Sequence, residues 1–409
     1  MKVLLIHQTF ISPEEAGGTR HYELARHCES QGIEFTIVAS NLTYLTGRPV
    51  DSRSGLVTEE RKGPVRVLRA KTLQTLHRSF VWRILSFLSF MVTSVFAGLK
   101  AGPVDVVMGT SPPIFQAFSA WLVSVLRRKP FIFEVRDLWP EFAVDIGLLR
   151  NPLLIGIARW FERFLYSQAT HLIVNSPAYV DYLVERKGVD REKVTLIPNG
   201  VNPGMFDPEA KGEALRAEWG VREKFVVTYA GAIGMANDIP TILDAAELLT
   251  DQKEIRILIV GDGKELPRVR ELTKQRNLSN VVITGALPKS RMAEVLAASD
   301  ACLATLKNIP MFKTTYPNKV FDYMAAGRPT ILGIDGVIRD VVEGENAGVF
   351  VPPGNPEALS EAIQKLYRDP ELCQRMGRSG RQGVEQRFDR AKHARDFGEL
   401  LIRIGTKST

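Results

Sequence analysis

The chain has 409 residues, more than one hydrophobic core usually organises, so two domains are expected. Its fractions of hydrophobic residues (45%) and charged residues (24%) are those of a soluble globular protein, and they exclude a disordered chain. The three cysteines, Cys28, Cys302 and Cys373, lack the spacing of a metal or redox site, which predicts a reducing cytoplasm. The first residues, MKVLLIHQTF, are too short and too strand-like for a signal peptide.

The net charge of +7 is unevenly placed along the chain. Residues 61–129 hold 11 basic residues and one acidic residue, Asp105. The same span contains sixteen uncharged residues (84–99), whereas a membrane-spanning helix needs about 20. We therefore expect residues 61–129 to lie on an anionic membrane as an amphipathic segment, with a core helix and a solvated basic face as the alternative. Nucleic acid is not an expected partner, because no basic stripe interleaved with aromatic residues is present.

The N-terminal residues read as strand, loop, helix and strand, ending with EFTIVAS (34–40). This order is typical of the start of a doubly wound α/β domain. It does not match the dinucleotide fingerprint, because no G-x-G-x-x-G follows the first strand. Gly17 and Gly18 precede the helix, where backbone amides could approach a phosphate, and Arg20 lies beside them. A plain turn is the alternative.

A second polar cluster follows the predicted strand Phe131–Phe133. Its members are Glu134, Arg136, Asp137 and Glu141. Polar groups just past the carboxyl end of a parallel strand face the crevice where such sheets bind ligands. The cluster therefore predicts a functional edge, although the acids could instead cap the next helix.

The chain from Val201 to Lys224 is rich in proline, glycine and charge, which indicates a linker between a first domain (1–200) and a second (225–390). The second domain repeats the alternation of apolar strands and amphipathic helices. We expect the two domains to face each other across a cleft. The last helix, within 391–409, is expected to pack back on the first domain.

The stretch PNKVFDYMAAGRP (317–329) predicts a helix whose first turn can bind an anion. Asn318 is the expected N-cap, and Gly327 is the expected stop. Lys319 and Asp322 lie near the free N–H groups, where a lysine and a carboxylate could hold a phosphate and a sugar hydroxyl. An exposed ion pair between these two side chains is the alternative.

Seven motifs in this order resemble the family 4 glycosyltransferases, most of all the N-acetylfucosaminyltransferase-like enzymes of O-antigen and capsule assembly. They are GGTR (17–20), SPP (111–113), EVRDLWPE (134–141), IPNGV (197–201), YAGAIG (229–234), VGDG (260–263) and NKVFDYMAAGRP (318–329). The resemblance covers nearly the whole chain, and it implies the GT-B fold, which has two doubly wound Rossmann-like α/β domains.

The resemblance also implies a nucleotide-sugar donor, expected to be UDP-linked, bound mainly by the second domain. Arg136 or Asp137 falls where many members carry a histidine near the reacting sugar, and Asp322 replaces a glutamate that bonds the donor ribose. The glycines of two loops would approach the diphosphate; they are Gly17 and Gly18 in the first domain, and Gly231 and Gly234 in the second. The stretch Gly285, Ala286 and Leu287 would hold the base.

Besides Asp322, other positions depart from the family pattern. Thr314 stands where the first of two glutamates is usual, and Ala232 and Asn237-Asp238 replace the usual Arg/Lys pair. Other cations must therefore meet the diphosphate. The candidates are Lys319, Lys313, Lys307 and Arg20, and Lys319 is preferred.

No D-x-D occurs in the sequence, so neither a metal nor any other cofactor is expected. The resemblance implies transfer with retention of configuration. Arg136, Asp137 and Glu141 are the catalytic candidates, and either acid could act as a base if the reaction inverts. The expected acceptor is a saccharide on polyprenyl diphosphate, met at the inner face of the plasma membrane. A sugar-nucleotide epimerase or hydrolase and a non-catalytic sensor are the alternatives.

Overall fold

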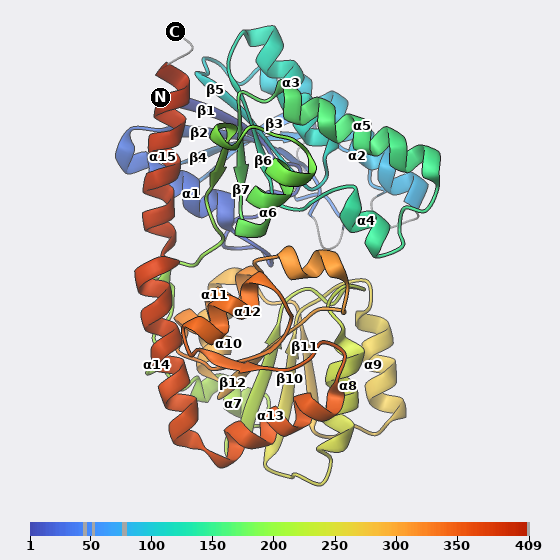
Figure 1. The fold of residues 1–409 in the computed structure, drawn as a ribbon, viewed down its shortest axis with the longest axis vertical. Helices are drawn as coiled ribbons and strands as arrows, with labels where there is room; N and C mark the ends of the chain where they lie inside the picture. Colours follow the sequence, from blue (N-terminus) through green and yellow to red (C-terminus); the bar gives the residue numbers. More distant parts are fainter. Residues whose placement is uncertain (44–46, 51–53, 76–79, 407–409) are drawn as a thin grey trace. The chain divides into compact units, whose positions relative to one another are not determined.

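The computed structural model describes residues 1–43, 47–50, 54–75 and 80–406, and it divides the chain into two compact units (Figure 1). The first unit contains Met1–Ser12, Thr19–Pro198 and Ala391–Thr409, and the second contains Pro13–Gly18 and Asn199–Arg390. Each unit is built on a parallel sheet with helices on both faces. The predicted class, two doubly wound α/β domains, is confirmed.

The sheet of the first unit has eight strands in the order β3-β4-β2-β1-β5-β6-β7-β8, and only β3 pairs antiparallel. The strands are β1 (Lys2–Ile6), β2 (Glu34–Ser40), β3 (Val57–Lys62), β4 (Val65–Ala70), β5 (Val106–Thr110), β6 (Phe131–Val135), β7 (His171–Val174) and β8 (Val194–Leu196). Strand β1 lies between β2 and β5, so the winding direction of the sheet reverses there. Ligands of open α/β sheets bind at such a switch point, outside the carboxyl ends of the strands.

Two layers of helices cover this sheet. Val3 and Leu5 pack on one side with α1 and α15, whereas Leu4 faces α2 and α3 on the other. The helices of the first unit are α1 (Arg20–Cys28), η1 (Glu29–Gln31), α2 (Phe80–Leu99), α3 (Phe115–Arg127), α4 (Glu141–Asp145), α5 (Pro152–Gln168), α6 (Pro177–Asp181), η2 (Tyr182–Arg186), η3 (Arg191–Lys193) and α15 (Arg390–Thr406).

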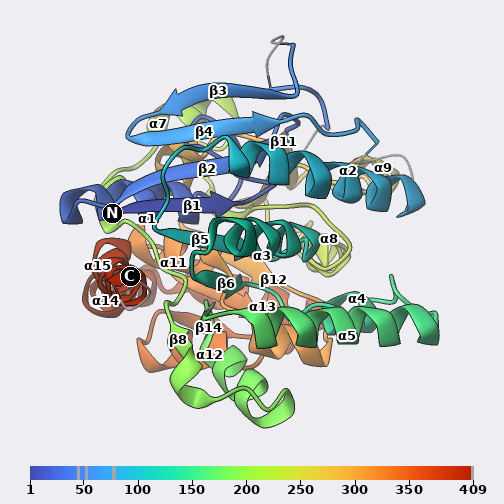
Figure 2. The same ribbon diagram turned by 90° about the horizontal axis from the view of Figure 1, so that it is seen from above.

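Helix α2 is longer than the uncharged run at 84–99 suggested. It starts at Phe80, and the stretch Val81–Leu99 is long and apolar enough to cross a membrane by length and composition. In the structure α2 packs against α3, which in turn contacts α5 (Figure 2). The expectation that this segment is too short to span is therefore wrong, because the helix continues through Arg83 and Trp82. Residues 76–79 of the predicted contact segment lie outside the described residues.

The six-stranded sheet of the second unit is entirely parallel, in the order β11-β10-β9-β12-β13-β14. Its strands are β9 (Phe225–Ala230), β10 (Ile255–Val260), β11 (Val281–Gly285), β12 (Ala301–Thr305), β13 (Thr330–Gly333) and β14 (Gly348–Phe350). Its helices are η4 (Pro203–Met205), α7 (Glu213–Glu218), α8 (Ile239–Leu248), α9 (Leu266–Gln275), η5 (Lys289–Arg291), α10 (Met292–Ala297), η6 (Pro310–Thr314), α11 (Asn318–Ala325), α12 (Val337–Gly344), α13 (Pro356–Arg368) and α14 (Pro370–Arg387). Here β9 lies between β10 and β12, which places the switch point beside Gly231.

The boundaries of the units differ in detail from the predicted domains. The loop Pro13–Gly18 groups with the second unit although it precedes α1 of the first. Residues 201–224, predicted as a linker, carry η4 and α7 and belong to the compact second unit. The C-terminal residues from Ala391 group with the first unit.

Candidate active site

The first turn of α11 lies beside the carboxyl end of β9. Lys319 Nζ donates to the Tyr229 hydroxyl at 2.7 Å and lies 4.0 Å from the centre of the Tyr229 ring. A Cβ on Gly231 would lie only 2.8 Å from Lys319 Nζ, and the φ of Gly231 is 156°. Glycine is therefore required at position 231, because a side chain would displace the lysine.

The ammonium of Lys319 has a neutral partner. Burial lowers the pKa of Lys319 to about 7, and burial also raises the pKa of the Tyr229 phenol. The alternative of a Lys319–Asp322 ion pair is not what the structure shows, since Lys319 bonds Tyr229 instead. An unneutralised ammonium at a helix start is suited to receive an anion.

The predicted boundaries of α11 are right at one end and wrong at the other. Gly327 adopts a left-handed conformation (φ 66°) just after the helix, as expected of a stop. Asn318 is the first helical residue, not the N-cap, and Pro317 before it offers no side-chain acceptor. The Asn318 amide oxygen instead accepts from Arg390 Nη2 at 3.4 Å.

Asp322 forms an ion pair that the sequence did not suggest. Lys289 Nζ donates to Asp322 Oδ2 at 2.5 Å, and both side chains are largely buried. Lys289 opens η5, four residues after Gly285 and two residues after Leu287, the last residue of the stretch expected to hold the base. The pair therefore joins the expected ribose position to the expected base position.

The N-terminal glycine loop lies against the same part of the second unit. The carbonyl oxygens of Glu15 and Pro13 each accept from the backbone of η5 at 3.1 Å, from Lys289 and Ser290 respectively. A Cβ built on Gly18 would lie 3.8 Å from Asn318 Nδ2. The structure thus brings Gly17-Gly18 to the start of α11, near Lys319.

The other candidate donor contacts of the second unit are more scattered. Gly234 follows β9, and Gly285, Ala286 and Leu287 lie at the carboxyl end of β11. Lys313 is exposed and bonds Asp335 at 2.8 Å, so its charge is already paired. Lys307 is exposed. Among the described residues, Lys319 is thus the only one of the candidate cations in this unit that is not exposed, and no carboxylate pairs with it.

In the first unit a buried carboxylate collects three donors. Glu134 is fully buried at the end of β6, and it accepts from Arg20 Nε at 2.9 Å, from Thr110 Oγ1 at 3.0 Å and from His21 Nε2. Burial alone would raise the pKa of Glu134, but His21 and Arg20 outweigh it and hold the pKa well below its ordinary value. The network is a structural ion cluster.

Arg20 belongs to this cluster and not to the donor loop that precedes it. Besides Glu134, its guanidinium bonds the Pro198 carbonyl at 2.8 Å and the Ile197 carbonyl at 2.7 Å. Its side chain is only 3% exposed. These contacts occupy the guanidinium, so we do not propose Arg20 as a diphosphate ligand.

Arg136 and Asp137 follow β6 at the same edge, near the switch point. Arg136 Nε donates to the Ser111 carbonyl at 2.9 Å, and Arg136 Nη2 lies 3.3 Å from His7 Nε2. Burial raises the pKa of Asp137 to about 6, against the opposing effect of Arg136. His7 was not singled out from the sequence, although its place directly after β1 was the available signal.

Glu141 is less suited to catalysis than Asp137. Arg159 bonds it at 2.8 and 2.9 Å, and Lys187 lies at 3.6 Å. The hydrogen bond from Arg159 lowers the pKa of Glu141, despite partial burial. A carboxylate stabilised in this way is a weak base.

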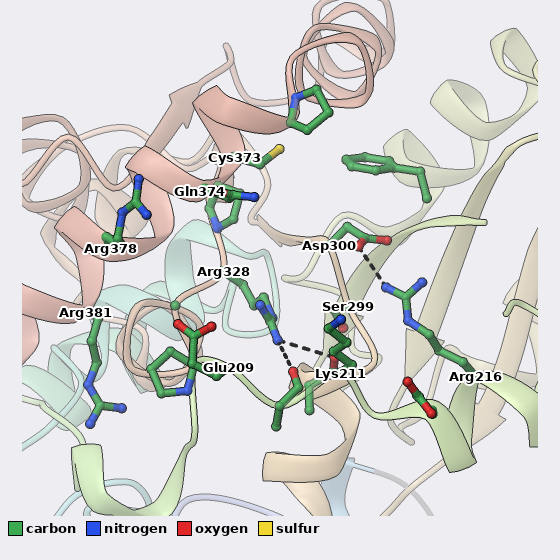
Figure 3. A pocket seen from close by; sticks show the side chains of 18 of the residues that line it. Glu209, Lys211, Arg216, Ser299, Asp300, Arg328, Cys373, Gln374, Arg378 and Arg381 are labelled. Atoms are coloured by element: carbon green, nitrogen blue, oxygen red, sulfur yellow. Dashed lines mark hydrogen bonds and ion pairs between the residues drawn. The ribbon is translucent and has the colours of Figure 1, made fainter. Parts of the chain in front are cut away.

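A cavity of 1460 Å³ in the second unit lies at the opposite edge of its sheet (Figure 3). Phe225, Asp300 and Pro329, which line it, are at or next to the amino ends of β9, β12 and β13. Its Arg328 bonds the Leu296 carbonyl at 2.9 Å, and its Arg216 pairs with Asp300 at 2.8 Å. Because doubly wound sheets bind ligands at their carboxyl edge, we do not assign the donor to this cavity.

Two family descriptions match successive parts of the chain. "Glycosyl transferase 4-like domain" matches residues 16–200, and "Glycosyl transferases group 1" matches residues 212–383. The chain is a glycosyltransferase of the GT-B type. The predicted family is confirmed at this level, whereas nothing singles out the N-acetylfucosaminyltransferase-like group.

Individual relatives agree with this assignment. The putative colanic acid biosynthesis glycosyl transferase WcaI of Escherichia coli is 23% identical over 96% of this chain and 98% of its own. A D-inositol 3-phosphate glycosyltransferase of Segniliparus rotundus is 27% identical over 64% of this chain, and the match spans 58% of that relative.

Solved structures share the fold. Sucrose-phosphate synthase from Thermosynechococcus elongatus has a TM-score of 0.77 at 22% identity, covering 99% of both chains. HepE of Anabaena in complex with UDP has a TM-score of 0.70 at 17% identity, covering 98% of this chain and 100% of its own. WaaG, a glycosyltransferase involved in lipopolysaccharide biosynthesis, has a TM-score of 0.72 at 14% identity, covering 98% of this chain and 99% of its own.

Proposed function

We propose that this glycosyltransferase moves a hexosyl or N-acetylhexosaminyl group from a UDP-sugar to a saccharide carried on polyprenyl diphosphate. The product would serve bacterial surface polysaccharide synthesis, such as O-antigen. The observation that carries the donor half of this proposal is Lys319, a half-buried ammonium at the switch point of the second unit, for which the described residues provide no carboxylate partner. The HepE complexes with UDP and the name of the WcaI relative support the nucleotide and the pathway class.

The chemistry requires that charge on the leaving group be stabilised. Breaking the bond between the sugar and the diphosphate builds negative charge on the phosphate oxygens, and aligned N–H groups and a cation stabilise it. Lys319 and the first turn of α11 would supply both, with Gly231 and Gly17-Gly18 allowing close approach of the backbone. We propose that no divalent metal is needed, since the sequence has no D-x-D and Lys319 supplies the positive charge.

We place the reacting sugar near the edge that Arg136 and Asp137 occupy in the first unit, and we propose retention of configuration. Asp137 titrates near neutral pH, so its ionised form can accept a hydrogen bond or a proton from a substrate hydroxyl.

A donor panel tests this function. Purified protein is screened for thermal stabilisation by UDP-, GDP- and dTDP-sugars, and the best donor is then incubated with polyprenyl-diphosphate acceptors with and without EDTA. Transfer that persists in EDTA is the expected result. Consumption of the donor without an acceptor would indicate an epimerase or hydrolase, and binding without any turnover would indicate a sensor. Strict dependence on manganese or magnesium would overturn the metal-free mechanism.

We also propose that the first unit lies on the inner, anionic face of the plasma membrane, where a lipid-linked acceptor would be met. Helix α2 has apolar residues on both sides. Ser86, Ser94 and Phe90 are fully buried, whereas Val92 and Phe96 are more than half exposed. The exposed apolar side departs from the usual amphipathic arrangement, in which the outward side of a surface helix is polar.

Helix α5 extends the same apolar surface beyond the predicted segment. Its inward side includes Glu162, which is fully buried and bonds Lys187 Nζ at 2.6 Å. Its outward side includes Leu153 and Trp160, which are 72% and 65% exposed. Aromatic contacts through Phe115 link α5 and α2 across α3.

The charges around this surface fit an anionic partner. Between residues 81 and 168 the exposed charged side chains are one acid, Asp145, and five cations: Lys100, Arg128, Arg150, Arg159 and Arg163. Exposed apolar patches rimmed by cations are typical of proteins that dock on anionic lipid.

Sedimentation with vesicles tests the docking. We expect the protein to bind phosphatidylglycerol-containing vesicles at low salt and to bind less at high salt. The change Leu153→Ser with Trp160→Ser should weaken binding by about tenfold or more, because it removes two exposed apolar anchors. The change Leu248→Ser, at a leucine of the second unit that is 53% exposed, is the control. Equal binding by all three proteins would reject the surface, and dimer formation through it would identify a second copy as the partner instead.

A further inference from the structure

Arg136 is held by acceptors that carry no charge. Its Nε donates to the Ser111 carbonyl at 2.9 Å, and its backbone N–H points to Ser111 Oγ at 3.4 Å. Its Nη2 lies 3.3 Å from His7 Nε2. Both partners lie at the switch point, since His7 follows β1 and Ser111 follows β5.

The histidine in this contact is neutral. His7 is 3% exposed, and burial lowers its pKa well below the ordinary value, with His21 and Arg136 lowering it further. Two groups lie 3.3 Å from His7 Nε2, the Arg136 Nη2 and the Thr9 hydroxyl. The guanidinium has only donors and the hydroxyl can donate, so in the arrangement that bonds Arg136 the Nε2 accepts and the ring proton resides on Nδ1. His7 Nδ1 is buried without a hydrogen-bond partner.

Two carboxylates lie near Arg136, and neither forms an ion pair with it among the described contacts. Glu134 already accepts from Arg20, His21 and Thr110. The charge of Arg136 lowers the pKa of the neighbouring Asp137, but burial outweighs that effect. Arg20 is therefore paired with a carboxylate, whereas Arg136 is oriented by neutral acceptors.

We propose that His7 is a positioning residue that fixes Arg136 without neutralising it, so that Arg136 binds a phosphate oxyanion of a substrate. This inference rests on the proposed function, which supplies two sources of that chemistry. One is the diphosphate of the donor, and the other is the diphosphate that links the acceptor saccharide to its lipid. A neutral acceptor suits this role because a carboxylate in place of His7 would compete with the substrate oxyanion for the guanidinium.

Three variants separate orientation from simple packing. His7→Gln keeps an acceptor close to the position of Nε2, His7→Phe keeps the ring shape without an acceptor, and Arg136→Met removes the charge. The matched control is His171→Phe, a second buried histidine of the first unit, which starts β7 at the other edge of the sheet and bonds Thr195.

Two assays identify the source of the oxyanion. Titration with UDP measures the donor arm, and kcat/KM for an acceptor on lipid diphosphate, against the same saccharide on a neutral lipid linker, measures the acceptor arm. In one arm, Arg136→Met and His7→Phe should each lose about 10- to 100-fold, as for one charge-assisted hydrogen bond. His7→Gln should recover to within about threefold, and His171→Phe should change neither arm. Changes below about twofold in both arms for Arg136→Met would overturn the proposal, as would equal losses for His7→Gln and His7→Phe.

A spectroscopic readout tests the contact without turnover. In protein labelled with ¹⁵N-histidine, His7 should show the tautomer protonated on Nδ1, and Arg136→Met should change that signal. A His7 ring protonated on Nε2 would overturn the inference even if transfer activity is established. Absence of any transfer by the wild-type protein, with the expected tautomer present, would instead reject the proposed function.

Discussion

Among the described residues, the switch points of the two units each hold a cation without an ion-pair partner, but the two cations differ in kind. In the first unit the cation is Arg136, which neutral acceptors orient. In the second unit Lys319 bonds a phenol, and burial brings its pKa to about 7. The comparison teaches that the cation of the first edge is of a type that stays charged, whereas the cation of the second can gain or lose its proton with pH or with a bound anion.

Removing the lysine should produce the largest effect. We expect Lys319→Ala to lower kcat/KM for the donor by about 10²- to 10³-fold, the range for loss of a group that stabilises a developing oxyanion. The melting temperature of the ligand-free variant should not fall, because a desolvated ammonium does not stabilise the fold. Steady-state kinetics and a thermal melt measure both. Lys313→Ala, at an exposed lysine already paired with Asp335, is the control and should retain activity.

The carboxylates of the first unit provide the next contrast. Asp137→Asn should lower kcat by about 10²-fold or more, whereas Glu141→Gln should change it by a few fold at most, because Arg159 and Lys187 already occupy Glu141. The acid limb of kcat/KM should lie near pH 6, since Asp137 has a pKa of about 6 and is protonated below it. A larger loss for Glu141→Gln than for Asp137→Asn would reverse the assignment.

The pH dependence of donor binding sharpens the comparison. Free Lys319 loses its proton above about pH 7, and a bound diphosphate requires that proton to be regained. The affinity for UDP should therefore fall by about tenfold for each pH unit above 7. Lys319→Arg should bind with little dependence on pH between 7 and 9, because arginine stays charged. Calorimetric titration at several pH values measures this slope, and a flat wild-type profile would contradict the role of Lys319.

The smallest effect is expected at Lys289. Its charge is neutralised by Asp322, so Lys289→Met should raise the donor KM by about 3- to 10-fold and leave kcat nearly unchanged. Arg291→Met in the same short helix is the control, because Arg291 pairs with exposed Glu294. Equal KM values for the two variants would place the ribose elsewhere.

The sequence predicted the parts of this protein that depend on local pattern. The alternation of apolar strands and amphipathic helices predicted both sheets, and the prediction that Gly327 stops α11 is confirmed. The same stretch predicted Lys319 as an anion ligand, an assignment that still awaits measurement.

Other features depend on partners far away in the chain. The Asn318 side-chain oxygen does not cap the helix, and it accepts a hydrogen bond from Arg390 instead. Asp322 is paired because η5 places Lys289 next to it. The periodicity of α5 could not predict that its exposed face is apolar, because periodicity alone would place the charged Glu162 outward. Glu162 faces inward because Lys187, 25 residues later, forms an ion pair with it. Long-range pairs of this kind leave no signal in local spacing.

The placement of α15 has a consequence for biogenesis. Phe397, Leu400, Leu401 and Ile404 from the last helix share a core with Val3 and Leu5 of the first strand. During translation the ribosome therefore releases every strand of the second unit before the nascent first unit can bury its own earliest residues. We infer that the half synthesised first is the half completed last, and that a stop codon shortly after residue 390 would leave an apolar groove on it for chaperones and proteases to recognise.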